Sequence, residues 1–211
     1  MSGIIAQNTL DNSGLIKAPA GGGAWNFIKK LTASASSDLS FVDGTSDVVL
    51  DSTYKEYIFT FNNIHSDRAF DVAYSLDFQF NMSIDSGSNY NVTKTTTMFR
   101  SQHSEAGGDE SFAYQSDRDL AQSTAFQTLA QYVGTESDNS SSGYLHLFNP
   151  SSTTFVKHFI CTLSCVYSNT FIREYFIAGY GNTTSAVDAV QFKFSADEID
   201  AGDICLYGIS S

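Results

Sequence analysis

The stretch Leu76-Asp77-Phe78-Gln79-Phe80-Asn81-Met82-Ser83-Ile84 decides the fold class of this chain. Apolar side chains occupy every second position from Leu76 to Ile84, and polar side chains occupy the positions between them. Successive side chains of a β-strand point to opposite faces of a sheet, so strict alternation over this length predicts a half-buried strand. We therefore expect a fold built from β-sheets.

A turn-rich segment, Asp85-Ser86-Gly87-Ser88-Asn89, follows this strand, and a threonine-rich strand is predicted from Tyr90 to Met98. Two strands joined by a short glycine-containing loop are typical of a β-hairpin. The loop also has oxygen-bearing side chains at alternate positions, as calcium-binding loops do, but it lacks the bidentate glutamate of an EF-hand. We therefore interpret it as a plain hairpin turn.

Turn residues separate the other predicted strands at intervals of roughly 10 to 15 residues, which is typical of an antiparallel β-sandwich or jelly roll. Residues 119–133 are an exception, because apolar side chains such as Leu120 and Leu129 fall near helical spacing before Gly134. One short helix is predicted there. The other predicted strands are 25–31, 54–62, 144–148, 155–166, 171–180, 189–195 and 203–209.

The chain has 211 residues, enough for one domain with a short arm. Its 11 Lys and Arg residues against 23 Asp and Glu residues give a formal net charge of −12. Such acidity repels nucleic-acid phosphates and anionic lipid, so no nucleic-acid partner is expected. No apolar run approaches the roughly 18 residues of a membrane-spanning helix, so no membrane insertion is expected either. The N-terminus lacks the features of a signal peptide, and we expect synthesis in a cytoplasm.

Residues 1–24 differ from the rest, which leads us to divide the chain into an N-terminal arm (1–24) and a β-sandwich domain (25–211). Gly21-Gly22-Gly23 is typical of a flexible linker. The arm also carries two apolar pairs, Ile4-Ile5 and Leu15-Ile16. A solvated tail is one interpretation. We favour an arm that orders against another subunit with these four residues as anchors, because a solvated tail has little use for paired apolar side chains.

The histidines show no metal-binding spacing. His65 and His103 are isolated, whereas His146 and His158 lie in adjacent predicted strands. Two ligands without nearby carboxylates seldom hold a metal ion, so we favour histidines on a polar sheet face. We expect no metal and no cofactor.

The three cysteines, Cys161, Cys165 and Cys205, cannot all pair within one chain. Cys161 and Cys165 are predicted on one strand, where four steps span roughly 13 Å, and a disulfide needs Cα atoms within about 7 Å. Buried free thiols are therefore expected. A catalytic cysteine is not, because His158 falls on the opposite face of the same strand.

Paired carboxylates are the one enzyme class that the sequence leaves open, since a glycosidase needs two acids about 5–9.5 Å apart. Asp77, Asp109, Glu110 and Asp117 are the candidates, and solvated surface acids are the favoured interpretation. We predict no catalytic residues. A carbohydrate-binding module is a separate alternative, in which exposed aromatics such as Tyr90, Tyr114 and Tyr144 stack on sugar faces.

Three groups of residues carry a family resemblance that spans nearly the whole chain. They are Ser13-Gly14-Leu15-Ile16-Lys17-Ala18 with Gly21-Gly22-Gly23-Ala24-Trp25; Leu50-Asp51-Ser52-Thr53-Tyr54-Lys55-Glu56-Tyr57-Ile58-Phe59; and Gly143-Tyr144-Leu145-His146-Leu147-Phe148-Asn149-Pro150-Ser151-Ser152 with Gly202-Asp203-Ile204-Cys205-Leu206-Tyr207-Gly208-Ile209. The chain resembles a widespread group of tailed-bacteriophage virion proteins, common in phages of marine bacteria and described as structural or tail-fibre-like.

The resemblance implies a structural component of a virion that is assembled in the bacterial cytoplasm. The arm would dock on other virion proteins, and the β-domain would project outward as a homotrimer, with host-surface glycan as a candidate ligand. The tail adsorption apparatus is the favoured location, and a capsid decoration or head fibre is the alternative. The group carries no active-site residues that transfer to this chain.

Overall fold

The computed structural model describes residues 24–68, 76–135, 138–167 and 170–210, and all strands found there belong to two antiparallel sheets. The large sheet has eight strands, in the order β1 (Trp25–Ser36), β12 (Ile199–Ile209), β3 (Glu56–Ser66), β8 (Ser141–Phe148), β9 (Lys157–Tyr167), β10 (Phe171–Gly181), β5 (Lys94–Ser104) and β6 (Ser111–Tyr114). The small sheet has four strands, in the order β2 (Leu39–Val42), β11 (Ala189–Phe194), β4 (Phe78–Ser83) and β7 (Gln127–Ala130).

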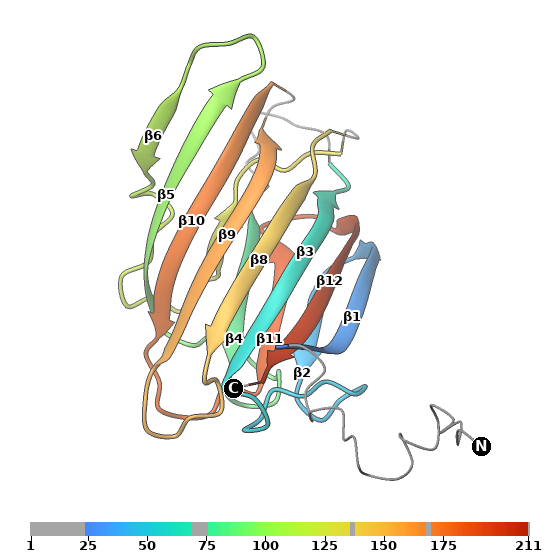
Figure 1. The fold of residues 1–211 in the computed structure, drawn as a ribbon, viewed down its shortest axis with the longest axis vertical. Helices are drawn as coiled ribbons and strands as arrows, with labels where there is room; N and C mark the ends of the chain where they lie inside the picture. The colour runs from blue at the N-terminus through green and yellow to red at the C-terminus, as the bar shows by residue number, and fades with distance from the viewer. Residues whose placement is uncertain (1–23, 69–75, 136–137, 168–169, 211) are drawn as a thin grey trace, which may run out of the picture.

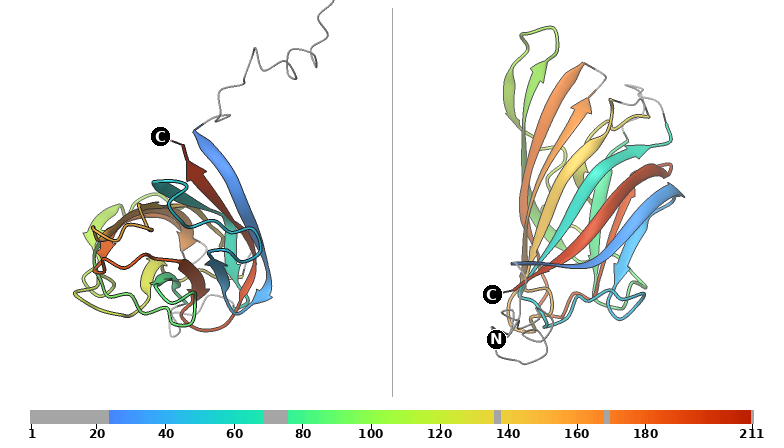
Figure 2. Two further views of the ribbon diagram at one scale, coloured as in Figure 1. Left: turned by 90° about the horizontal axis from the view of Figure 1, so that it is seen from below. Right: turned by 45° about the vertical axis from the view of Figure 1, so that its right-hand side comes forward.

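The two sheets pack face to face (Figure 1). Seen from below, the large sheet curls around the small one (Figure 2). The predicted antiparallel β-sandwich is therefore confirmed, and a jelly roll is compatible with this arrangement. Within the described residues, no helix is long and apolar enough to cross a membrane.

Aromatic side chains from both sheets fill the space between them. The apolar side of the decisive stretch points inward, and Phe78, Phe80 and Met82 are fully buried. Phe80 meets Phe159 of the large sheet edge-on, with ring centroids 4.8 Å apart. Each such side chain contributes about 1.5–3 kcal/mol on burial, so this layer is the main source of stability.

The polar side of β4 is buried as well, contrary to the expectation of a half-buried strand. Asn81 and Ser83 are both inaccessible to solvent. The Asn81 amide donates to the carbonyl oxygens of Tyr90 (2.6 Å) and Thr124 (3.0 Å). Because these loops cover β4, the Asn81 side chain donates to backbone carbonyl groups.

The predicted hairpin is wrong. Strand β4 pairs with β11 and β7, whereas β5 pairs with β10 and β6, so residues 84–93 cross from one sheet to the other. The turn itself forms, with the Asp85 carboxylate accepting from the backbone N–H of Asn89 at 2.8 Å. The carboxylate of Asp188, next to β11, also accepts from Ser86 N–H at 3.0 Å. The loop is therefore anchored to the neighbour of β4 while the chain passes on to the large sheet.

The predicted helix at 119–133 is also wrong. Part of this segment is β7, and the residues before β7 follow the edge of β5, where Thr96 N–H donates to Leu120 C=O at 2.9 Å. After β7, Val133 N–H donates to Leu76 C=O at 3.3 Å. Gln122 and Tyr132 have φ values of 49° and 58°, which a right-handed helix does not tolerate. Backbone pairing with β4 and β5 overrides the helical spacing of the apolar residues.

The anchors predicted in the arm, Ile4, Ile5, Leu15 and Ile16, lie outside the described residues. The description begins at Ala24, whose carbonyl oxygen accepts from Ser210 N–H at 2.9 Å. The chain therefore enters the domain beside its C-terminal strand.

Candidate functional site

The side of the large sheet that faces away from the small sheet is the outer face. On a strand, alternate residues point to this side. Several large apolar side chains there are unusually accessible, and among them Trp25 is 50% exposed, Phe27 61%, Tyr144 44% and Ile160 49%. Figure 1 looks onto the large sheet with the small sheet behind it. The sandwich thus has apolar side chains on both sides of one sheet.

Strand pairing aligns the outer residues into three neighbouring rows, which we call the apolar strip. The first row is Trp25, Ile209, Glu56 and Phe148. The second is Phe27, Tyr207, Ile58, His146, Ile160, Ala178 and Thr97. The third is Lys30, Cys205, Thr60, Tyr144, Thr162, Phe176, Phe99 and Tyr114.

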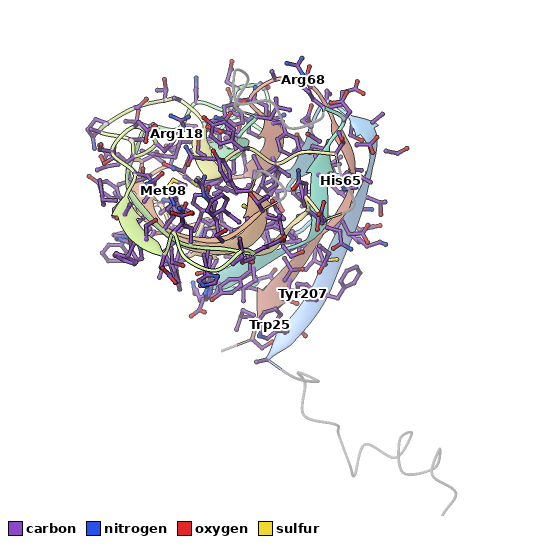
Figure 3. All side chains as sticks on the ribbon, turned by 90° about the horizontal axis from the view of Figure 1, so that it is seen from above. Trp25, His65, Arg68, Met98, Arg118 and Tyr207 are labelled. Atoms are coloured by element: carbon purple, nitrogen blue, oxygen red, sulfur yellow. The ribbon has the colours of Figure 1, made fainter. Side chains whose placement is uncertain are left out.

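Aromatic clusters mark the two ends of the apolar strip. At the β1 end, the ring of Tyr207 lies 5.5 Å from Trp25 and 5.7 Å from Phe27, centroid to centroid. Figure 3 shows Trp25 and Tyr207 together, on the opposite side of the molecule from Arg118. At the β6 end, the ring of Phe99 lies 5.0 Å from both Phe112 and Phe176. Ring contacts hold these side chains in place while one surface of each cluster faces solvent.

A depression of about 470 Å³ lies between the β1 end and the middle of the strip. It is lined by Trp25, Glu56, Ile58, Tyr144, His146 and Ile209. Two of the polar lining groups lie close together, with His146 Nε2 3.0 Å from Glu56 Oε2. The ring of His146 also packs on Phe148, with centroids 4.1 Å apart. An apolar floor with one acid and one imidazole suits a ligand or partner that is mainly apolar.

Of the three tyrosines predicted as glycan contacts, only Tyr144 lies in this depression. Tyr114 is exposed on the edge strand β6, and its hydroxyl donates to Asp119 at 2.6 Å. Tyr90 packs against the turn, because a Cβ added at Gly87 would lie 2.8 Å from its hydroxyl oxygen. Burial raises the pKa of Tyr90. The structure therefore separates the three residues.

The histidines and cysteines lie largely where the sequence placed them. His146 and His158 are on the outer face of adjacent strands, and His146 stands within the apolar strip. The described part of the chain holds no group of three side chains suited to a metal ion. All three cysteines are free and buried, and burial raises the pKa of Cys165 to about 12.

Two of the four candidate carboxylates meet at one cation. Arg118 Nε lies 2.8 Å from Asp77 Oδ2, and its Nη1 lies 2.8 Å from Asp117 Oδ2. Asp77 is only 6% exposed, so this carboxylate is buried and not solvated as expected. The exposed Glu110 lies 3.5 Å from His103 and away from that pair. The Asp77 contacts are those of a structural ion pair.

Most residues of the apolar strip were not predicted from the sequence as site residues. The signal was present in strands with consecutive apolar residues, such as Tyr57-Ile58-Phe59, Phe159-Ile160-Cys161 and Tyr175-Phe176-Ile177. A strand with one solvated face should alternate, so these runs indicate that both faces are apolar.

Comparison with known proteins gives no significant match to a family model, a curated protein or a solved structure.

Proposed function

We propose that this chain is a non-enzymatic structural component of a tailed-phage virion, in the tail adsorption apparatus, and that it assembles as a homotrimer. The apolar strip is the observation that supports this role. Its exposed aromatic side chains form a surface that suits contact with protein. The family resemblance in the sequence is the reason for assigning the chain to a virion.

The apolar strip is unlike the outer side of an ordinary sandwich sheet. Antiparallel sheets with a solvated side carry polar residues there, in alternation with the core residues. Here Phe27, Ile160 and Tyr144 occupy those positions and are about half exposed. Contiguous apolar surface on soluble proteins marks interaction sites. A subunit held within a larger particle would keep such a surface away from water.

Antibody labelling of purified phage particles tests the proposal. Antibodies raised against the purified chain should decorate the tail tip in electron micrographs. Label confined to capsid faces would place the protein among capsid decorations or head fibres and remove the tail assignment. Particles that carry no label, and whose denatured proteins do not react either, would contradict a virion role.

Carbohydrate binding is a second candidate, favoured by the depression in the apolar strip. Trp25 and Tyr144 supply aromatic faces for stacking on sugar rings, and Glu56 supplies a hydrogen-bond acceptor. A glycan array tests this function: binding that disappears in Trp25→Ala and Tyr144→Ala but survives in Tyr114→Phe would support it. An array without signal for the native chain would count against it.

A further inference from the structure

We propose that copies of this chain associate with one another through the apolar strip. The inference rests on the proposed function, in which this face meets protein, and it identifies the partner as a second copy. Three observations support it: the charge of the strip, its extent, and the nature of the β1 edge beside it.

Charge decides between classes of partner. The chain has a net charge of −12, but the three rows of the strip contain one acid, Glu56, one base, Lys30, and one histidine, His146. A basic partner would find a single acid within the strip, and that acid lies 3.0 Å from His146. The matching surface is another apolar and nearly uncharged one, and each copy of this chain presents such a surface.

The extent of the strip is sufficient for a stable contact. Strands lie about 4.8 Å apart and alternate residues about 6.6 Å apart, so the three rows give a flat footprint of roughly 600 Å². Projecting rings such as Phe27 and Trp25, 61% and 50% exposed, add accessible surface to that footprint. Specific interfaces bury about 800 Å² per partner. The strip is therefore of the size that a protein–protein contact needs.

The outer edge of β1 is a poor alternative contact. A long exposed edge can pair with a strand of another chain. In β1 the pairing register shifts between Phe27 and Lys29, and Lys29 and Lys30 follow at that point. Bulges and edge lysines are the features by which sheets prevent edge-to-edge pairing. Association through the face is compatible with such an edge.

Solution mass of the full-length protein, measured by light scattering, tests the inference with a matched pair of variants. Ile160→Lys places a charge in the middle of the strip, where the side chain is 49% exposed. Ile84→Lys makes the same change off the strip, just after β4, at a side chain that is 43% exposed. Both side chains are partly exposed, so each variant is expected to fold, and circular dichroism checks that it does.

We expect the native chain and Ile84→Lys to have the mass of an oligomer, a multiple of 23.0 kDa, and Ile160→Lys to have the mass of one chain. The oligomer should persist or strengthen as salt is raised, because salt screens repulsion between acidic subunits. An Ile160→Lys protein as large as the native one would overturn the inference, and so would a native chain that is monomeric at physiological salt.

Trp25 reports what else covers the strip, because the chain has one tryptophan. If a monomeric native chain shows red-shifted Trp25 emission after residues 1–23 are removed, its own arm is the occupant and a second copy is not. If such a monomer binds glycans, carbohydrate is the ligand. An oligomer that forms through the strip, together with phage particles that the antibodies do not label, would refute only the virion role. A chain that the antibodies locate on the virion but that stays monomeric would refute only this inference.

Discussion

Phe192 of β11 meets Phe61 of β3 edge-on across the sandwich, with ring centroids 5.2 Å apart. Four further rings lie within 6.3 Å of Phe192, those of Phe41, Phe59, Phe78 and Phe80. One side chain of the small sheet therefore connects aromatic residues of both sheets.

Phe192→Ala should lower the free energy of unfolding by about 3–5 kcal/mol, because it leaves a cavity at this junction. Urea denaturation monitored by circular dichroism measures the change. Phe155→Ala is the control, since Phe155 is 68% exposed and its removal should cost less than about 0.5 kcal/mol. Equal losses in the two variants would show that the junction is not the centre of the core.

The ion pair between the buried Asp77 and the partly exposed Arg118 gives a second prediction. Asp77→Asn removes the acid at the Nε of the guanidinium and should destabilise the fold by about 1.5–3 kcal/mol, the range for a hydrogen bond to a charged group. Asp117→Asn removes the other acid of the same arginine, but the Asp117 side chain is 66% exposed, so about 0–1 kcal/mol is expected. The same urea experiment compares them, and a larger loss for Asp117→Asn would be inconsistent with the structure.

Backbone packing at Gly143 gives a third prediction. A Cβ at this position would lie 2.3 Å from the carbonyl oxygen of Thr162 and 2.7 Å from the Cα of Leu163, both on the neighbouring strand β9. Gly143→Ala should therefore lower the melting temperature and cost about 3 kcal/mol through overpacking. Ser164→Ala, at an exposed position of β9, should leave the melting temperature nearly unchanged. A tolerated alanine at Gly143 would mean that β8 and β9 are further apart than described.

Lys94 gives a prediction about pH. Its ammonium group is buried and donates to Asn81 Oδ1 at 2.5 Å and to Val92 C=O at 2.8 Å, and burial lowers its pKa to about 7. Between that value and the unfolded value of about 10.4, the unfolded chain binds the proton and the folded chain does not. This group therefore makes the fold more stable as pH rises through that window.

Comparison with Lys94→Met isolates this contribution from that of other titrating groups. The quantity compared is the unfolding free energy of the native chain minus that of the variant. Between pH 7 and 8.5 this difference should rise by up to about 1.4 kcal/mol per pH unit. Parallel stability curves for the two proteins would show that the folded chain keeps Lys94 charged.

The β-sandwich could be predicted because the decisive information is local. Alternation in residues 76–84 reports a strand directly, and Phe78 and Phe80 are buried as that pattern requires. Which strands pair with one another was harder to predict from the sequence. Residues 84–93 have the composition of a hairpin loop, yet they connect the two sheets, because β4 and β5 find better partners far away in the sequence.

The apolar strip was largely hidden in the sequence for a related reason. A sequence does not state which side of a strand is covered, so the outward position of side chains such as Ile160 and Phe176 could not be read from it. That position becomes visible once β9 and β10 are placed in one sheet with the small sheet on the other side. The helix assigned to 119–133 failed because pairing with neighbouring strands outweighs residue spacing.

Hydroxyl-radical footprinting of this chain within purified phage particles is the most direct test of the central claim, that the apolar strip is a protein contact surface in the virion. Oxidation is read out by mass spectrometry and scaled to the intrinsic reactivity of each amino acid. Our account predicts that Trp25, Phe27 and Tyr144 are protected several-fold relative to Phe155, which lies off the strip and is 68% exposed. Equal oxidation of all four residues in the assembled particle would contradict it.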